Sequence, residues 1–327
     1  MKAAVFYGKK EIRIEDVSVR DLNDGEVLIK VMSCGICGTD VHIYNGEKGS
    51  AEVTPPIILG HEYAGVVVKS KSSYFKEGDK VAIDPNINCG VCKFCQKGQI
   101  HLCENLKALG VNLNGGFAEY CIVPEKQAYK FENISFEEAA LVEPLACSLH
   151  GIEKIEPKPY EKALIIGLGP IGLIMLELLK SFGFKSISGV EVDNFRFDVA
   201  TKQGAKVYKP EELNKEETYD IVIECAGNKK SIELAFDKVE RGGKVLLFSV
   251  APPNLFVEVN PFELFKKDVN IYTSFVNPFT HSKALSLLES GSLNLSYIVS
   301  HKIGLEELKW YLENKAQNQL KCIVSFQ

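Results

Sequence analysis

The sequence of 327 residues has no long apolar run, no internal repeat and no excess of positive charge. A membrane-spanning helix needs roughly 18 consecutive apolar residues. No stretch approaches that length, so we expect no membrane partner. The formal net charge of −5 gives no general attraction to nucleic acid, which we therefore do not expect as a partner. Residues 1–7 have the pattern of a strand and not of an export signal, which predicts a cytoplasmic protein.

The composition is that of an ordinary globular protein, with 46% hydrophobic and 25% charged residues. A chain of this length predicts two domains rather than one. Its ten cysteines are many for a reducing compartment, where disulfides are rare. Because several of them are clustered, we expect them to bind metal rather than to form disulfides.

Four cysteines lie close together, at Cys89, Cys92, Cys95 and Cys103. Thiolates at these separations can complete a tetrahedral shell around Zn²⁺. Such a shell leaves no position for a substrate, so we predict a structural zinc that folds a lobe at about residues 86–106. A reactive or redox-active thiol cluster is the competing interpretation.

A second group of chemically reactive side chains comes from two short stretches, 34–42 and 60–62. Its members are Cys37, Thr39, Asp40, His42, His61 and Glu62. This mixture of thiol, imidazole and carboxylate predicts a catalytic zinc site with an open position for substrate. A further carboxylate, Glu143, falls where a predicted helix over 135–153 is interrupted by Pro144. A carboxylate at such a break can point into a cleft.

A nucleotide-binding pattern follows in the second half of the chain. A predicted strand over 162–166 leads into Gly167-Leu168-Gly169-Pro170-Ile171-Gly172, then a helix over 173–182 and a strand over 186–191. This context predicts a dinucleotide whose pyrophosphate lies at the helix N-terminus. Glu191 ends the second strand, where a carboxylate accepts hydrogen bonds from ribose hydroxyls and repels a 2′-phosphate. We therefore expect NAD rather than NADP, with Arg196 packed over the adenine.

The two halves of the chain differ in their secondary-structure pattern. Residues 1–123 contain short strand-like runs separated by Gly, Pro, Asn and Asp, whereas 219–290 alternate strands with helices. The fold class is therefore α/β, with a β-rich domain followed by a doubly wound parallel sheet. The Pro-rich stretch 154–159 marks the expected boundary.

These motifs together resemble those of the zinc-dependent medium-chain alcohol and polyol dehydrogenases. The resemblance rests on Cys-Gly-Ile-Cys-Gly-Thr-Asp-Val-His, Gly-His-Glu-Tyr-Ala-Gly, the Cys89 to Cys103 spacing, Gly115-Gly-Phe-Ala-Glu-Tyr and Gly-Leu-Gly-Pro-Ile-Gly. It implies a GroES-like catalytic domain over 1–153 and 291–327, and a Rossmann NAD-binding domain over 154–290. It also implies two zinc ions per chain, one catalytic and one structural.

The same resemblance implies roles for the residues of the catalytic zinc site. Cys37 and His61 match two of its ligands. The third ligand is Glu62 or Glu143, and the resemblance leaves this choice open.

The resemblance also implies how the site handles protons. Asp40 matches an acid that orients the metal-binding imidazole. Thr39 and His42 match a pair that relays a proton from the substrate to solvent.

The implied reaction is hydride transfer from a secondary alcohol of an alditol or alditol phosphate to NAD, which gives the ketose. The segment 141–151 favours this substrate class, whereas the stretch 37–45 also resembles L-threonine 3-dehydrogenase, which is the second candidate. Two rival classes are a non-catalytic protein that senses NAD or zinc, and a zinc-free quinone reductase. The resemblance further implies a homodimer or homotetramer, with residues 269–276 as a contact between sheets.

Overall fold

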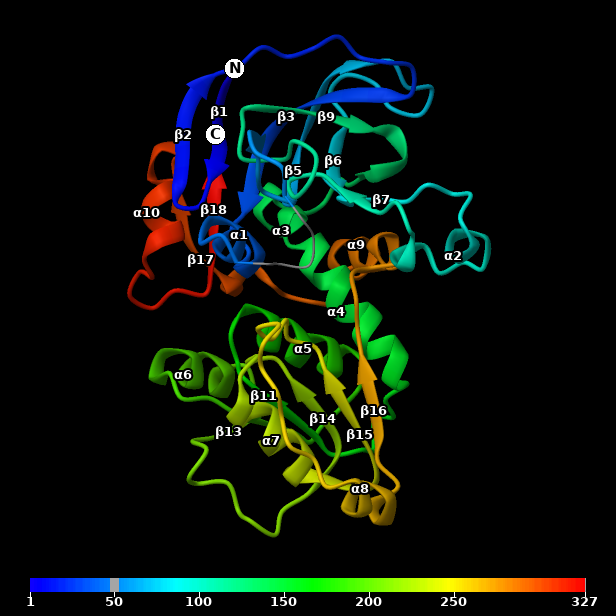
Figure 1. The fold of residues 1–327 in the computed structure, drawn as a ribbon, viewed down its shortest axis with the longest axis vertical. Helices are drawn as coiled ribbons and strands as arrows, with labels where there is room; N and C mark the ends of the chain where they lie inside the picture. The colour runs from blue at the N-terminus through cyan, green and yellow to red at the C-terminus, as the bar shows by residue number, and fades with distance from the viewer. Residues whose placement is uncertain (48–52, 327) are drawn as a thin grey trace. The chain divides into compact units, whose positions relative to one another are not determined.

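The computed structural model describes residues 1–47 and 53–326, and the chain divides into two compact units (Figure 1). The first unit comprises Met1–Ala146 and Val276–Gln327, and the second comprises Cys147–Phe275. We expected these boundaries at 153/154 and at 290/291. The chain thus leaves the first unit earlier, and returns to it earlier, than the sequence pattern suggested.

The chain rejoins the first unit at residue 276 because helix α9 (His281–Glu289) makes its contacts there. The carboxylate of Glu289 accepts hydrogen bonds from the backbone N–H groups of Glu132 and Asn133, at 2.6 and 3.2 Å. The hydroxyl of Thr280, just before the helix, donates to the carbonyl of Ala146 at 2.7 Å. Helix α9 therefore belongs to the first unit, although its sequence continues the strand–helix alternation of the second.

The first unit contains mainly antiparallel sheet. Its largest sheet has the order β10-β6-β5-β3-β18-β17, and β9 also pairs with β3. A smaller sheet has the order β2-β1-β4, and β7 pairs with β8. The strands are β1 (Lys2–Gly8), β2 (Glu11–Asp16), β3 (Glu26–Gly35), β4 (Ile57–Ile58), β5 (Glu62–Ser70), β6 (Lys80–Ile83), β7 (Asn86–Ile87), β8 (Lys107–Ala108), β9 (Tyr120–Pro124), β10 (Ala128–Lys130), β17 (Val299–Ile303) and β18 (Lys321–Ser325).

The helices of the first unit are short and lie mostly in the connections. They are α1 (Gly38–Tyr44), α2 (Lys93–Gln96), α3 (Phe136–Ala140), α9 and α10 (Leu308–Glu313), with single 3₁₀ turns η1 (Ile100–Leu102), η2 (Glu125–Gln127), η3 (Ser296–Ile298) and η4 (Leu305–Glu307). Strand β3 carries the core because Val27, Ile29 and Val31 alternate with less buried residues, which turns one face inward. The stretch that carries Cys37, Thr39 and Asp40 follows directly after this strand ends at Gly35.

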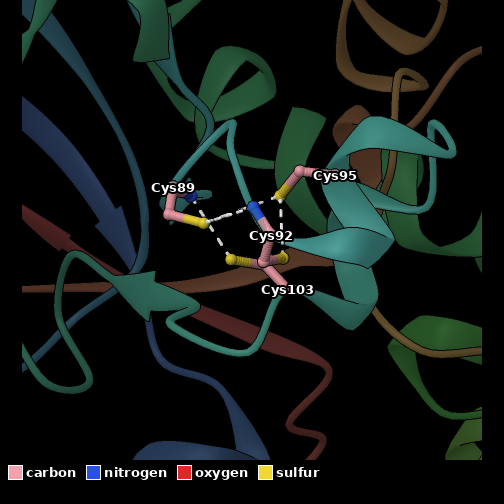
Figure 2. A group of neighbouring side chains, drawn as sticks. All are labelled: Cys89, Cys92, Cys95 and Cys103. Atoms are coloured by element: carbon pink, nitrogen blue, oxygen red, sulfur yellow. Dashed lines mark hydrogen bonds between the residues drawn. The ribbon is translucent and has the colours of Figure 1, made fainter.

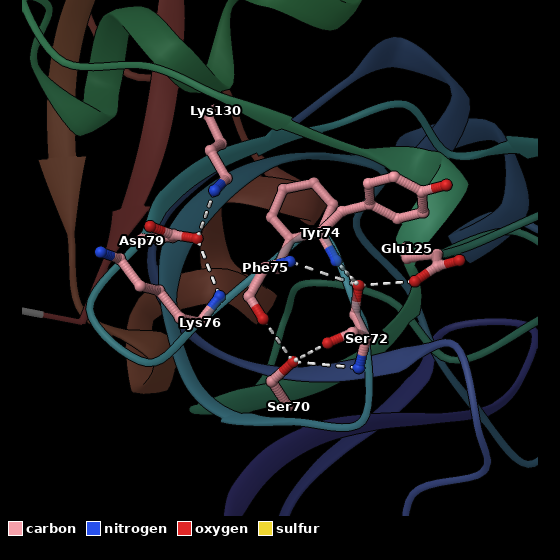
Figure 3. A network of polar contacts seen from close by, with 8 residues as sticks. All are labelled: Ser70, Ser72, Tyr74, Phe75, Lys76, Asp79, Glu125 and Lys130. Atoms are coloured by element: carbon pink, nitrogen blue, oxygen red, sulfur yellow. Dashed lines mark hydrogen bonds and ion pairs between the residues drawn. The ribbon is translucent and has the colours of Figure 1, made fainter.

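Polar side chains fix the loop that joins β5 to β6 (Figure 3). The hydroxyl of Ser72 donates to Glu125, and it also accepts from the backbone N–H of Tyr74 at 3.0 Å. The carboxylate of Asp79 pairs with Lys130 at 2.8 Å. These contacts attach the loop to the segment that carries β9 and β10.

The second unit contains one parallel sheet of six strands in the order β13-β12-β11-β14-β15-β16. The strands are β11 (Ala163–Ile166), β12 (Ile187–Val190), β13 (Lys206–Tyr208), β14 (Tyr219–Glu224), β15 (Val239–Leu247) and β16 (Asn270–Thr273), and the helices are α5 (Pro170–Ser181), α6 (Asn194–Lys202), α7 (Lys229–Lys238) and α8 (Pro261–Lys267). The chain moves outward from β11 first to one side and then to the other, which is the doubly wound order of dinucleotide-binding sheets. This confirms the predicted α/β class.

The break in the predicted helix 135–153 lies at Leu141, between α3 and α4 (Val142–Ile155), and not at Glu143 and Pro144 as we expected. Proline is tolerated in the first turn of a helix because its missing N–H has no partner there. The helix continues through it, and Leu145 N donates to Leu141 O at 3.0 Å. No helix in the described ranges is both long enough and apolar enough to cross a bilayer.

The first residue of α9, His281, is a buried imidazole that the sequence pattern did not single out. It is 1% exposed and lies against the ring of Tyr129, with 4.7 Å between ring centroids. Neither ring nitrogen has a hydrogen-bond partner among residues 1–47 and 53–326. Burial lowers the pKa of His281 to about 3, because a charged imidazole would lose its hydration there.

This pKa predicts that His281 makes the protein less stable in acid. Below its ordinary pKa the unfolded state binds a proton that the folded state cannot bind until about pH 3. The free energy of unfolding should therefore fall by about 1.4 kcal/mol for each unit below pH 6 through this group alone. Replacing His281 with Leu should remove that part of the slope in urea unfolding measured between pH 6.5 and pH 4.5. The half-exposed His301, changed to Gln, is the control, and an unchanged slope for the His281 variant would contradict the assignment.

Candidate active site

The first unit brings together Cys37, His61 and Glu62, whose ligand atoms all lie within 4.8 Å of one another. Cys37 immediately precedes α1, His61 immediately precedes β5, and Glu62 is the first residue of β5. Thiolate, imidazole and carboxylate at this separation are the donor set of a tetrahedral zinc site with an open fourth position. The residues present therefore fit a catalytic zinc ion.

A glycine in β3 makes room for one of these groups. Gly35 is paired with Glu62 across the sheet, and a Cβ on Gly35 would lie 2.3 Å from the Glu62 carboxylate. Only glycine leaves space for that carboxylate. The turn before the pair also depends on glycine, because a Cβ on Gly60, at φ +89°, would meet Cys34 and Phe117 at 2.8 Å.

Asp40 lies next to both Cys37 and His61. It is fully buried in α1, and one carboxylate oxygen accepts from Cys37 N at 2.8 Å. The other oxygen lies 3.5 Å from His61 Nδ1, a position from which a carboxylate can orient a metal-binding imidazole. Burial alone would lower the pKa of His61, but the charges of Asp40 and Cys37 raise it well above its usual value. A metal that binds this imidazole must therefore displace a proton.

Sequence reasoning missed Lys321, at the start of β18. Its ammonium is 5% exposed and donates to the two carboxylate oxygens of Glu62 at 2.6 and 2.9 Å, and to Ile36 O at 3.2 Å. Burial alone would lower the pKa of Lys321, but the negative charges of Glu62 and Cys37 raise it above its usual value. The sequence did contain one signal for this residue, because Lys321 is the first residue of a strand that is otherwise mostly apolar.

Removing this lysine should destabilise the metal-free protein more than the zinc-loaded protein. Lys321→Met leaves the Glu62 carboxylate buried without a partner, which costs about 3–5 kcal/mol. A bound metal would offset that charge if Glu62 is a ligand. Urea unfolding with and without zinc measures the difference, and adding Glu62→Gln should restore part of the loss. The control is Lys302→Met, whose half-exposed ion pair with Glu137 is worth at most about 1 kcal/mol. An equal loss with and without zinc would count against Glu62 as a ligand.

The remaining residues of the predicted catalytic group also lie in the first unit. Glu143 is buried in the first turn of α4, and its charge raises the pKa of Lys321, although it is not one of the three residues grouped around the metal position. Thr39 and His42 lie three positions apart in α1 and so share one face of that helix. The His42 ring contacts the carboxylate of Glu47.

Cys89, Cys92, Cys95 and Cys103 form a second group whose sulfur atoms all lie within 4.8 Å of one another (Figure 2). The Cys95 sulfur lies 3.5 Å from that of Cys92 and 4.0 Å from that of Cys89. Cys103 approaches the same position, because its sulfur accepts from Cys89 N at 3.3 Å. Backbone N–H groups also stabilise the thiolate of Cys92 and lower its pKa to about 6. These donors fit a closed Cys₄ zinc shell.

The glycine-rich motif of the second unit connects β11 to α5. Gly167 has a positive φ of +88°, and Gly169 precedes the helix that starts at Pro170 and continues through Ile171. A Cβ on Gly172 would lie 2.0 Å from Gly167 O, so this glycine allows the helix to pack against the turn. The arrangement leaves the first N–H groups of α5 without helical partners, which suits a pyrophosphate.

Glu191 and Arg196 lie beside this turn. The Glu191 carboxylate accepts from the backbone N–H groups of Leu168, Val192 and Asp193 at 2.8–2.9 Å. The Arg196 guanidinium would be 3.4 Å from a Cβ on Gly169. Both side chains therefore contact the loops where a dinucleotide is expected.

Glu224, at the end of β14, was also missed. It is fully buried and accepts from Ala226 N and Gly227 N at 2.8 Å, and from the Ser249 hydroxyl. Strands β11 and β14 are adjacent at the point where the strand order reverses, which is where ligands bind in such sheets. Glu224 thus holds the loops after β14 and β15 at this point.

Comparison with known proteins identifies the class to which this fold and these sites belong. Residues 23–133 match the alcohol dehydrogenase GroES-like domain, and residues 170–290 match the zinc-binding dehydrogenase domain. The chain is 34% identical to sorbitol dehydrogenase of Bacillus subtilis (strain 168), over 99% of this chain and 96% of that protein. The chain therefore belongs to the zinc-dependent alcohol dehydrogenase family and is an oxidoreductase.

Two further relatives bear on substrate and cofactor. L-threonine 3-dehydrogenase of Alteromonas mediterranea is 32% identical, over 92% of each chain. A zinc-binding dehydrogenase from Sinorhizobium meliloti 1021, solved with NADP bound, is 33% identical with a TM-score of 0.95, over 99% of this chain and 98% of that one. The resemblance inferred from the sequence motifs is thus confirmed at the level of the family, and the predicted GroES-like and Rossmann domains are both present.

Proposed function

We propose that this protein oxidises a secondary hydroxyl of a sugar alcohol, free or phosphorylated, and transfers the hydride to NAD, giving the ketose. The observation that carries the proposal is the group formed by Cys37, His61 and Glu62, supported by Asp40. Such a mixed shell suits a catalytic ion, whereas a closed shell suits a structural one. The sorbitol dehydrogenase relative supports the polyol class.

The proposed catalytic zinc is held by Cys37 and His61, and either Glu62 or Glu143 completes the shell. The proximity of Glu62 to the other two favours it, while its ion pair with Lys321 must weaken when it binds metal. The second zinc is proposed to be structural and to be held by the four clustered cysteines, Cys89, Cys92, Cys95 and Cys103.

In this mechanism, bound zinc supplies a Lewis acid that acidifies the substrate hydroxyl, and bound NAD accepts the hydride. The chain supplies the path for the proton. The Thr39 hydroxyl accepts it from the substrate, and the His42 imidazole passes it toward solvent. The Glu47 carboxylate beside His42 stabilises the imidazolium that forms transiently. Asp40 keeps the His61 ring oriented toward the metal position throughout.

The dinucleotide is proposed to bind the second unit at Gly167, Gly169 and Gly172, with its pyrophosphate at the N-terminus of α5. Glu191 is proposed to accept hydrogen bonds from the adenosine ribose, and its negative charge favours NAD over NADP. Arg196 is proposed to cover the adenine. Titration of the protein with NADH and NADPH, followed by nicotinamide fluorescence, should give tighter binding for NADH. Tighter binding of NADPH would refute this selectivity.

A panel of alditols, alditol phosphates and L-threonine tests the reaction. Zinc-loaded protein with NAD should form NADH, detected by its absorbance, with at least one alditol or alditol phosphate. The second candidate, L-threonine 3-dehydrogenase, is supported by the relative of that name and by the stretch 37–45. Turnover of L-threonine without turnover of any alditol would establish it in place of our proposal. Protein that binds NADH and zinc but oxidises nothing would indicate a sensor.

We further propose that two copies associate through the edge strand β16. This strand has a neighbour on only one side in the described sheet, and Ile271 within it is 46% exposed. Helix α8 exposes Phe262 and Phe265 at 62% and 80%, which is unusual for a surface that meets only water. Phe265→Asp should therefore lower the mass measured by light scattering toward that of one chain. Tyr160→Asp, at another exposed aromatic, should leave the mass unchanged.

A further inference from the structure

The first unit contains a small cavity that none of the roles above uses. Its volume is about 10 Å³, which is roughly the space of one water molecule. Three segments that are distant in the sequence supply its polar lining: Asp84, Asn86 and Asn88 around β7, His101 from η1, and Asn277 from the segment before α9. A carboxylate and several amides therefore border one small space.

The first of these segments has a spacing that suits cation binding. Asp84, Asn86 and Asn88 occupy alternate positions, and side chains at alternate positions of an extended backbone point to the same side. Loops that bind hard cations use the same Asp-x-Asn-x-Asn spacing to present side-chain oxygens. The spacing alone is weak evidence, but here the three residues line a common cavity.

The carboxylate of Asp84 has amide groups as its hydrogen-bond partners. Its Oδ1 accepts from Asn86 N at 3.1 Å, from Asn86 Nδ2 at 3.5 Å and from Asn277 Nδ2 at 3.4 Å. No Lys or Arg in the described part of the chain forms an ion pair with it. Loss of hydration raises the pKa of Asp84 to about 6. A desolvated carboxylate in this setting is stabilised by a bound cation.

The two amides can turn to receive such a cation. Asn86 Nδ2 now donates to Asn277 Oδ1 at 2.7 Å. Rotation of both amides by half a turn exchanges their nitrogen and oxygen positions without moving the backbone. The oxygen of each amide then faces the Asp84 carboxylate, while the two amides remain hydrogen-bonded to each other, and a positive ion between these oxygens would stabilise the arrangement.

The backbone conformation around Asn277 indicates that its contacts with Asn86 and Asp84 are held in place by the surrounding structure. Val276 and Phe279 have positive φ values of 46° and 59°, which are unfavourable for residues with bulky side chains. Such conformations persist where surrounding contacts maintain them. Asn277 is 1% exposed and provides side-chain contacts to Asn86 and Asp84 from this segment.

We propose that this cavity binds a monovalent cation of the size of K⁺, held by the carboxylate of Asp84 and the side-chain oxygens of Asn86 and Asn277. One carboxylate neutralises a single positive charge, whereas Ca²⁺ and Mg²⁺ sites usually combine several charged ligands or waters. K⁺ has nearly the radius of water, which matches the cavity. The site is independent of the proposed dehydrogenase reaction, so it can be tested without turnover.

Thermal unfolding of the zinc-loaded protein provides the first test. The protein is held in choline chloride, which is replaced stepwise by KCl, NaCl or LiCl at constant ionic strength. KCl at about 100 mM should raise the midpoint by about 2–4 °C, and LiCl should raise it less. Equal midpoints in choline, lithium and potassium salts would overturn the proposal. Diffraction from crystals soaked in a rubidium or thallium(I) salt should show an anomalous peak in the cavity, and a water there instead would also overturn it.

A variant locates the effect at Asp84. Asp84→Asn keeps the shape of the side chain and removes its charge, so the potassium-dependent shift should disappear. Asp79→Asn is the matched control, because Asp79 is an acid of the same unit that pairs with Lys130 and lies outside the cavity lining. It should keep the full shift. A shift that survives in Asp84→Asn would place the cation elsewhere and refute this site. If that variant does not fold, the anomalous peak in the unsubstituted protein decides the question.

Discussion

Replacing Cys37 with alanine should lower kcat/KM for the best alcohol substrate by at least about 10⁴-fold, which corresponds to roughly 5.5 kcal/mol. The thiol is proposed to be one of only three protein ligands of the catalytic zinc, and the two that remain would not hold a metal in the correct geometry. The variant should contain one zinc per chain by elemental analysis, because the Cys₄ group is untouched. Its thermal unfolding midpoint should change much less than its activity.

Cys34→Ala is the matched control for that experiment. Cys34 is a buried thiol of the same stretch, lies next to Gly60, and is not in the metal group. Its removal should cost stability through the cavity it leaves, with two zinc ions retained. If Cys37→Ala keeps two zinc ions, or keeps activity near that of the unsubstituted protein, the proposed catalytic site is wrong.

Replacing Cys95 with alanine should have the largest effect on stability. The Cys95 sulfur lies within 4.0 Å of those of Cys92 and Cys89, and desolvation with hydrogen bonding raises the pKa of its metal-free thiol to about 12. Zinc binding to comparable shells is worth about 10–16 kcal/mol in small peptides. Losing the metal should therefore unfold the lobe at residues 89–103, lower the unfolding midpoint by about 10 °C or more, and open the lobe to proteases.

The lobe offers few other contacts that could preserve its structure. Helix α2 contains no buried residue, and Val91 is 74% exposed. The control is Cys121→Ala, which removes a buried thiol that contacts Tyr63 at 3.2 Å but is not a metal ligand. It should keep two zinc ions and an intact lobe. Resistance of the Cys95 variant to limited proteolysis would show that the metal does not hold the lobe together.

Much of the molecule could be predicted because the decisive residues are close together in the sequence. The Cys₄ group falls within fifteen positions, 89–103, and the glycine-rich turn lies between a strand and a helix that both have clear patterns. Local geometry decides these features, so spacing is enough to identify them. The alternation of strands and helices likewise defined the parallel sheet.

The features that could not be predicted depend on contacts between distant segments. Lys321 reaches Glu62 only because β18 pairs with β3. The sequence of a strand does not by itself indicate which other strand it pairs with. Helix α9 has an ordinary amphipathic sequence, and the hydrogen bonds from Glu132 and Thr280 decide to which unit it belongs. The choice between Glu62 and Glu143 as a ligand was open for the same reason.

The pairing of β18 with β3 also affects when this protein can mature during synthesis. Register places Ile323 opposite Gly35, and the whole second unit is translated between these two residues. At cellular elongation rates, that interval lasts on the order of tens of seconds. The second unit can fold during this time, because its strands are all present by residue 273. The carboxylate of Glu62, in contrast, has no lysine partner until the ribosome has passed position 321. A nascent chain stalled before that point should therefore contain every proposed zinc ligand, but its Glu62 carboxylate should still lack the lysine partner.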